Sequence, residues 1–374
     1  MSTAQRPARP GSPFSDVRPD VVAAACAAAL ALVWVSVDGL PAGRWLAVHL
    51  FTLGVITPLI VAFSQHQAET ILHVPGRSRR WLRVALVGGA AVLAGGMVWS
   101  STPVIGAGST AIAAAVLASW WRLRKARKRS LGARFTWVVR GYERAHGAFL
   151  HGALLGALLG LGLIPGTAYI AFRIAHLHAM VLGFAAVTLL STVVLYGPTL
   201  LRAQLEPGAD VAGSRWVRRI ATAATVGVLA LLLSALPDPY GVAARLVAAV
   251  AIGMCAVGAG GIVVPLIRTV ARRGRRAPAP GMLLTAAVTW LVLGIAGDAV
   301  LVASGAWHWL DPLGAVVLVG GFAQAIAATL LHVVASWLPR QRRLAVRGRL
   351  DSAPPWVVMA PQLGVAALGV AVLL

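Results

Sequence analysis

The chain has 374 residues, of which 59% are hydrophobic and only 12% are charged. A soluble domain carries about 25% charged residues, so this composition excludes an ordinary soluble protein and indicates a protein of the lipid bilayer. The net charge of +22 does not indicate nucleic-acid binding, because the basic residues stand in short loops between apolar runs and form no basic face.

Apolar runs of about 20 residues, the length that crosses the hydrocarbon core, recur along the whole chain. After a cytoplasmic N-terminal tail over residues 1–20, we predict a single all-α transmembrane domain over residues 21–374, a bundle of about eleven spans. Because the first run is as long as a full span and others follow it, we interpret it as a retained helix rather than a signal peptide. The predicted spans are 21–39, 45–65, 82–100, 103–121, 147–166, 173–200, 217–236, 240–267, 281–304, 312–338 and 355–374.

Positive charge alternates between the connections. The connections after the even-numbered spans are rich in arginine and lysine, whereas those after the odd-numbered spans are short and nearly uncharged. Because basic loops stay in the cytoplasm, the N-terminus is predicted inside and the C-terminus outside. We expect a multi-pass protein of the plasma membrane, in contact with membrane lipid. The basic stretches run over 77–83, 122–144, 202–219, 268–276 and 340–349.

With this orientation the nine histidines fall into two groups by depth. An ionisable residue in a membrane is costly and therefore a functional candidate, and imidazole is the common nitrogen ligand of iron and copper. The outer group is His49, His176, His178 and His308, and the inner group is His66, His73, His146, His151 and His332.

The most distinctive local pattern is the pair His176 and His178 in one predicted span. At the helical period their side chains point about 200° apart, so one helix can provide a ligand on each flank, as a His-x-His pair does in heme-copper oxidases. His49 and His178 are each followed five residues later by a glycine, Gly54 and Gly183. This spacing suggests a weak internal repeat, in which a glycine lets a flat macrocycle approach the helix.

Other polar residues have both a functional and a plainer interpretation. Arg173, three residues before His176, is placed to bind a heme propionate on the outer side or is simply a helix-end arginine. Asp298 is a proton-handling group, the partner of a histidine, or a carboxylate at the water line. Membrane histidines also serve as helix–helix hydrogen-bonding residues, and His66 and His146 are candidates for interfacial residues that face water.

Several known sites are absent from the sequence. It has no Cys-x-x-Cys-His motif for covalent heme, no nucleotide-binding glycine loop and no zinc-type cluster. It also has no paired His-His of the kind that completes the copper site of heme-copper oxidases, so we expect no oxygen reduction. The two cysteines, Cys26 and Cys255, fall in apolar runs and are expected to be small buried residues.

Four segments carry a resemblance to a known membrane domain. The run Trp-Leu-Ala-Val-His-Leu-Phe-Thr-Leu-Gly-Val-Ile-Thr over 45–57, continued by Ser-Gln-His-Gln-Ala-Glu-Thr over 64–70, resembles the domain that precedes copper nitrite reductase or multicopper oxidase modules in some actinobacterial fusion proteins. The resemblance continues over 175–184, 196–202 and 320–339. That domain is distantly similar to the NnrS family, heme-binding membrane proteins linked to nitric oxide, and to heme-copper oxidase subunit I.

The resemblance implies a membrane-embedded heme protein. It would hold b-type heme through His49 and His178, or His176, near the outer face, with copper as the other metal to consider. It would take electrons from quinol and pass them to an extracytoplasmic cupredoxin or copper nitrite reductase, or anchor that protein. The predicted external C-terminus suits such a partner. Because the chain stops at Leu374 without a cupredoxin module, we expect that it does not reduce nitrite alone.

Two further expectations remain open. Members of that group carry tyrosine near the position of His332, which argues against a ligand role there. The alternative function is a transporter or handling protein for copper or a small nitrogen species, with the same histidines as a relay. The spans show no clear pair of half-length broken helices, although Pro58 is placed to kink the second span. A purely structural assembly factor would require that no histidine matter.

Overall fold

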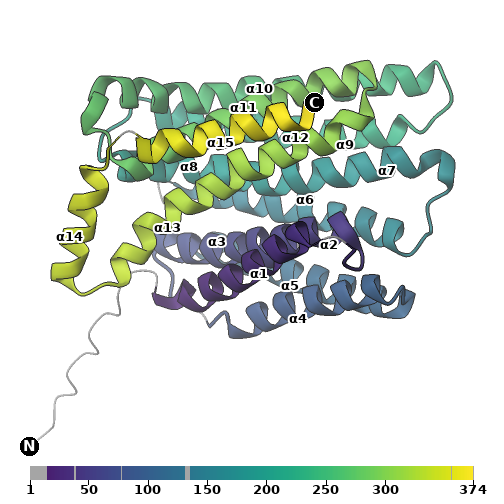
Figure 1. The fold of residues 1–374 in the computed structure, drawn as a ribbon, viewed down its shortest axis with the longest axis horizontal. Helices are drawn as coiled ribbons and strands as arrows, with labels where there is room; N and C mark the ends of the chain where they lie inside the picture. Colours follow the sequence, from purple (N-terminus) through teal and green to yellow (C-terminus); the bar gives the residue numbers. More distant parts are fainter. Residues whose placement is uncertain (1–14, 38, 77, 131–134, 355, 374) are drawn as a thin grey trace, which may run out of the picture.

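The computed structural model describes residues 15–37, 39–76, 78–130, 135–354 and 356–373, and in these residues every regular element is a helix (Figure 1). The protein is therefore an all-α helical bundle, as the composition predicts. The helices run side by side along the long axis of the molecule, and α14 lies across one end. In chain order they are α1 (Arg18–Ser36), α2 (Gly43–Phe51), η2 (Thr52–Ile56), α3 (Thr57–Leu72), α4 (Arg80–Val98), α5 (Thr102–Arg129), α6 (Thr136–Gly160), α7 (Gly166–His178), η3 (Ala179–Ala186), α8 (Val187–Leu201), α9 (Ala209–Leu233), α10 (Tyr240–Arg273), α11 (Ala279–Ser304), η5 (Trp307–Trp309), α12 (Leu310–Val316), η6 (Val317–Ala323), α13 (Gln324–Trp337), α14 (Arg340–Asp351) and α15 (Trp356–Leu373).

Within the described residues, nine helices are long and apolar enough to cross a membrane. They correspond to predicted spans 1–4 and 6–10, and three of them, Gly43–Leu72, Gly166–Leu201 and Trp307–Trp337, join several of the elements above into one continuous helix. The last predicted span is a shorter apolar helix over Trp356–Leu368. Their apolar outer faces suit contact with lipid.

Predicted span 5 is displaced. Residues 147–166 were expected to be helical, but α6 is Thr136–Gly160 and so begins well inside the predicted cytoplasmic loop. The charged start of α6 is held by an ion pair between Glu143 and Arg127 of α5, with Nε to Oε1 at 2.6 Å. A helix outside the hydrocarbon needs no apolar surface, so hydropathy alone misplaces its start. α6 packs against α5, α7, α8 and α9, so it lies among the other helices while its first turns carry charged residues.

Three continuous helices contain a π-helical segment: η2 in span 2, η3 in span 6 and η6 in span 10. A π turn inserts one residue into an α-helix and is frequent at functional sites. His49 lies shortly before η2 and His178 directly before η3, whereas the helix before η6 carries no histidine. The structure thus gives the weak repeat around these two histidines a shared backbone feature and extends that feature to a third span.

The glycines of this repeat serve helix packing rather than access for a macrocycle. A Cβ on Gly54 would lie 2.7 Å from the Cβ of Ala27 in α1, and a Cβ on Gly183 would lie 2.7 Å from the Cβ of Ala148 in α6. Both distances are too short for carbon atoms, so each glycine is required because a neighbouring helix approaches its backbone closely. The expectation that these positions face a flat cofactor is wrong.

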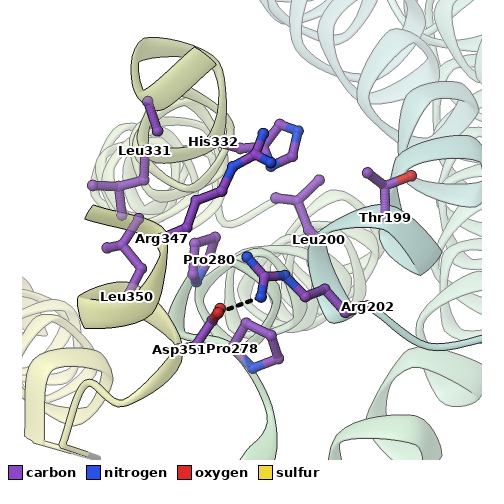
Figure 2. A pocket seen from close by; sticks show the side chains of 11 residues that line it. Thr199, Leu200, Arg202, Pro278, Pro280, Leu331, His332, Arg347, Leu350 and Asp351 are labelled. Carbon is purple, nitrogen blue, oxygen red and sulfur yellow. Dashed lines mark hydrogen bonds and ion pairs between the residues drawn. The ribbon is translucent and has the colours of Figure 1, made fainter. Parts of the chain in front are cut away.

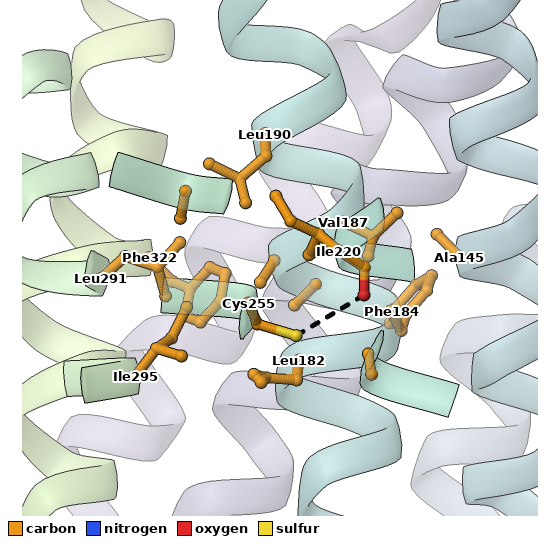
Figure 3. Close-up of a cluster of buried hydrophobic side chains, with 14 of the residues drawn as sticks. Ala145, Leu182, Phe184, Val187, Leu190, Ile220, Cys255, Leu291, Ile295 and Phe322 are labelled. Atoms are coloured by element: carbon orange, nitrogen blue, oxygen red, sulfur yellow. Dashed lines mark hydrogen bonds between the residues drawn. The ribbon is translucent and has the colours of Figure 1, made fainter. Parts of the chain in front are cut away.

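Buried apolar side chains fill the interior between α6, η3, α9, α10 and α11 (Figure 3). Cys255 is fully buried there, and its Sγ lies 3.6 Å from the carbonyl oxygen of Ile220. The prediction for Cys255 is therefore confirmed, whereas that for Cys26 is wrong, because Cys26 is exposed on α1. The run around Cys26 is apolar because the outward face of the peripheral helix α1 suits contact with lipid rather than with the protein interior.

Candidate functional site

His49 is held by its own helix. It lies on α2, and its Nδ1–H donates to the carbonyl oxygen of Trp45 at 2.8 Å. The Trp45 ring stacks on the imidazole, with ring centroids 4.0 Å apart and planes inclined by 17°. Because a carbonyl can only accept, Nδ1 carries the proton and the neutral ring has its lone pair on Nε2. His49 is thus a preoriented imidazole with a nitrogen available for a ligand.

His176 is also held by a hydrogen bond from Nδ1–H to a backbone carbonyl, but the carbonyl belongs to a neighbouring helix. It lies on α7, and its Nδ1–H donates to the carbonyl oxygen of Gly152 in α6 at 2.7 Å. The ring lies against Gly156, where an added Cβ would stand 2.7 Å from the ring carbon Cε1. Among the described residues Nε2 of His176 has no hydrogen-bond partner, and the imidazole lies within electrostatic range of His49. Among the described residues, α2 and α7 thus each present an imidazole with one ring nitrogen that has no hydrogen-bond partner, and the two rings lie within electrostatic range of each other.

His178 faces a different helix, and both of its ring nitrogens have hydrogen-bond partners. Its Nδ1 lies 2.8 Å from the carbonyl oxygen of Ile174, and its Nε2 lies 2.8 Å from Oδ2 of Asp298 on α11. Of the three interpretations of Asp298, the structure supports that of a histidine partner. Either the imidazole is protonated and the carboxylate ionised, or the carboxylic acid donates to Nε2, so the pair shares one proton in both cases. No lone pair is left on His178 for a metal in this arrangement.

Arg173 is paired with a protein carboxylate. Its Nη2 lies 2.7 Å from Oδ1 and 2.8 Å from Oδ2 of Asp311 at the start of α12, and both side chains are largely exposed. The contact ties α7 to α12 at the end of the bundle predicted to be outside. To bind a heme propionate, the Arg173 guanidinium would have to break its contact with Asp311 or contact both carboxylates at once.

His146 belongs to a separate, buried network. Its Nδ1–H donates to the carbonyl oxygen of Tyr142 at 2.8 Å, so Nε2 accepts from the hydroxyl of Ser119 at 3.0 Å. Gln65 of α3 in turn donates its Nε2 to Oγ of Ser119 at 2.9 Å and to the carbonyl oxygen of Ser119 at 2.8 Å. His146 has no exposed surface, so the interpretation of an interfacial histidine facing water is wrong. It is a helix–helix hydrogen-bonding residue that connects α6 to α5 and α3.

The other histidines of interest lie apart from one another. His66 has its Nδ1 3.2 Å from Oδ2 of Asp16. His332 lines a pocket at the opposite end of the bundle from His49 and forms no hydrogen bond with His49 or His176. His308 is exposed in η5 beside Trp309. Across the part of the chain that the structure describes, no group of three His, Cys, Asp or Glu side chains is arranged to hold a metal ion.

Sequence reasoning missed the residues that orient the two imidazoles. Trp45 could have been found as an aromatic residue one helical turn before His49. Gly152 and Gly156 belong to a small-residue series with a four-residue spacing on α6, which is the known signal for a close helix contact. That signal identifies a face of α6 but does not reveal that an imidazole lies on it.

No protein-family model, curated protein or solved structure matches this chain. The likeness to the membrane domain of copper nitrite reductase fusions therefore stays a prediction from the quoted segments.

Proposed function

We propose that the chain is a membrane-embedded redox protein that holds b-type heme between α2 and α7, with His49 and His176 as the axial ligands. The observation that carries this proposal is the matched state of the two imidazoles. Each donates Nδ1–H to a backbone carbonyl, at 2.8 and 2.7 Å, and each leaves Nε2 available. A ligating histidine usually has this arrangement, because the second hydrogen bond fixes the tautomer and the ring orientation.

The number of donors suits heme better than a bare copper ion. A porphyrin brings four nitrogen atoms of its own, so two axial imidazoles complete the coordination of its iron. A structural or catalytic site for an isolated metal ion needs three or four protein ligands. His178 is a poorer candidate than His176, because both of its ring nitrogens are already engaged by Ile174 and Asp298.

The protein's own residues have defined tasks in this proposal. Trp45 holds the His49 ring by stacking and through its carbonyl group. The carbonyl of Gly152 and the missing side chain of Gly156 position the His176 ring. Bound heme would supply one-electron transfer. The pair that Asp298 forms with His178, two residues after His176 along the chain, would hold a proton.

The direction of electron flow follows from the predicted orientation. Both imidazoles lie toward the outer end of their spans if the basic connections are cytoplasmic. An extracytoplasmic copper protein of the nitrite reductase type is then the natural acceptor or anchored partner, and quinol in the bilayer is the natural donor. The depth of the two histidines and the resemblance of the segments around them support this assignment.

The first experiment is an absorption spectrum of the detergent-purified protein, oxidised and then reduced with dithionite, with iron and copper analysis of the same sample. We expect a sharp α-band on reduction and stoichiometric iron in the wild type. The His49→Ala variant should lose both, and the control His308→Ala, which removes an exposed loop histidine, should keep both.

Two results would contradict the proposal. One is an unchanged heme spectrum in His49→Ala. The other is a colourless wild-type protein, free of iron and copper, from cells that are replete in heme. The second result would move the assignment to the transporter or to a simple membrane anchor, and metal-dependent uptake into vesicles would then separate those two.

A further inference from the structure

At the end of the bundle predicted to be cytoplasmic, α14 covers a pocket between α8, α11 and α13 (Figure 2). Its outer part is an open hollow of about 470 Å³ between α8, α13 and α14. Its inner part, which reaches Pro278 and Pro280 at the start of α11, has a volume of only about 20 Å³. The sequence predicted only a basic loop here. The structure turns part of that loop, Arg340–Asp351, into a helix and directs some of its side chains into the pocket.

Two arginines from different parts of the chain line this pocket, Arg202 beside Asp351 and Arg347 beside His332 (Figure 2). Arg202 at the end of α8 forms an ion pair with Asp351. Arg347 of α14 has no hydrogen bond or ion pair among the described residues, and both arginines lie within electrostatic range of the His332 imidazole. Asp351 is the acidic residue among those that line the pocket. The pocket therefore has a positive balance and one guanidinium without an acceptor.

The backbone holds Arg202 at this place in a conformation that is unfavourable for its residue type. Arg202 caps the C-terminus of α8 with φ 47° and ψ 42°, in the left-handed region where glycine is usual. Its carbonyl oxygen accepts a hydrogen bond from Nη1 of Arg273 at 2.8 Å. Keeping an arginine in a left-handed cap costs energy, and His73 caps the C-terminus of α3 in the same conformation.

The walls of the pocket add the other features of a headgroup site. Thr199, one helical turn before Arg202, also lines the pocket (Figure 2). Leu331 and Leu344 line the pocket and are exposed on the outside of the helices, where lipid chains would lie. Basic pockets between transmembrane helices on the cytoplasmic side are known to bind phosphate-bearing headgroups, and the guanidinium fork matches the geometry of a phosphate.

We propose that the pocket formed by Arg202, Arg347 and Thr199 under α14 binds a phosphate-bearing anion. The apolar walls suit the headgroup of an anionic phospholipid, and a free phosphate shares the same recognition chemistry. The site is separate from the outer histidines and does not depend on the proposed heme function.

The test is native mass spectrometry of the full chain in neutral detergent, titrated with dioleoylphosphatidylglycerol, with dioleoylphosphatidylcholine or with inorganic phosphate. We expect phosphatidylglycerol to bind more tightly than phosphatidylcholine. The Arg347→Gln variant should weaken phosphatidylglycerol binding about fivefold, as expected for one arginine at a membrane surface. The matched control is Arg349→Gln, which removes the same charge from the exposed face of α14 and should bind as the wild type does.

The arms of the experiment separate the sources of the anion. Tight binding of phosphatidylglycerol that millimolar inorganic phosphate does not displace supports a lipid. If inorganic phosphate displaces phosphatidylglycerol from the wild type but not from Arg347→Gln, the result supports a free phosphate. An equal loss in Arg347→Gln and Arg349→Gln would show attraction to overall charge and overturn the proposal, as would the absence of any preference over phosphatidylcholine. If Arg347→Gln does not fold, Arg347→Lys keeps the charge, removes the fork and should bind with intermediate affinity.

Discussion

Two histidines of the predicted outer half and one of the predicted inner half are held in opposite ways. In the outer half, His49 and His176 each use one ring nitrogen on a carbonyl and leave the other without a partner. In the inner half, His146 uses both nitrogens and is completely buried. The difference lies in the neighbours, because Ser119 offers a hydroxyl to His146 and no described side chain does so for the outer pair. A membrane histidine is thus a ligand candidate when only one of its two ring nitrogens has a hydrogen-bond partner.

His178 shows a third arrangement. It is nearly as buried as His146, yet its second nitrogen faces the carboxyl group of Asp298 instead of a hydroxyl. A carboxyl group can exchange a proton with imidazole, whereas a serine hydroxyl cannot do so readily. The comparison therefore separates three roles for histidine in one bundle: an available ligand, a proton-sharing pair and a structural crosslink.

The largest expected effect concerns the choice between the two histidines of α7. The His176→Ala variant should lose the heme completely, because one of two axial ligands is removed, whereas His178→Ala should retain it. The reduced-minus-oxidised spectrum and the iron content of both variants check this. A heme that is lost in His178→Ala but kept in His176→Ala would exchange their roles and break the comparison.

The next effect tests the support of His176 by α6. The Gly156→Ala variant places a Cβ 2.7 Å from Cε1 of the His176 ring and must displace the ring. We expect heme affinity to fall about 10- to 100-fold, the usual result of losing the support of a metal ligand. The matched control is Gly147→Ala on the same helix, where an added Cβ meets nothing within 4 Å. Heme titration of the two apoproteins should separate them, and equal affinities would contradict the geometry.

A smaller effect on heme, but a clear one on stability, is expected at Asp298. The Asp298→Asn variant breaks a buried pair and should lower the free energy of unfolding by about 3 kcal/mol, with heme still bound. Thermal unfolding in detergent measures the loss. Combining it with His178→Ala should cost less than the sum of the two single variants, since both remove the same contact. Additive losses would show that the two side chains do not interact.

The smallest effect is expected in the inner network. The Ser119→Ala variant leaves Nε2 of His146 without a donor and removes one acceptor from Gln65, which should cost about 1–3 kcal/mol of stability. The heme spectrum should be unchanged, because this network contains no available imidazole. A shifted or missing α-band in Ser119→Ala would place the cofactor in the inner half instead.

Much of the bundle could be predicted from the sequence because lipid imposes a simple rule on it. Apolar length places the spans, and charge alternation orders them. The rule fails where a helix extends into, or lies entirely in, a charged segment. α6 is central and begins in a charged segment, and α14 lies across the end of the bundle as an arginine-rich helix, so hydropathy misplaced the first and missed the second.

The candidate site was predictable only in part. His49, His176 and His178 were found because ionisable residues are rare in apolar runs. Their roles could not be ranked, since the ranking depends on acceptors from other helices, the carbonyl of Gly152 and the carboxyl of Asp298. Those partners are far away in the sequence. The carbonyl of Gly152 is reached through the packing of α7 against α6, and the carboxyl of Asp298 through the contact of His178 with α11.

Electron paramagnetic resonance of the oxidised protein tests the central claim most directly, because the spin state of ferric heme reports its axial ligands. We predict a low-spin bis-imidazole signal in the wild type that persists in His178→Ala. Substituting either His49 or His176 by alanine should abolish it, because the heme is lost. A low-spin signal that survives both of those substitutions, or a wild-type protein without heme iron, would contradict the assignment of His49 and His176.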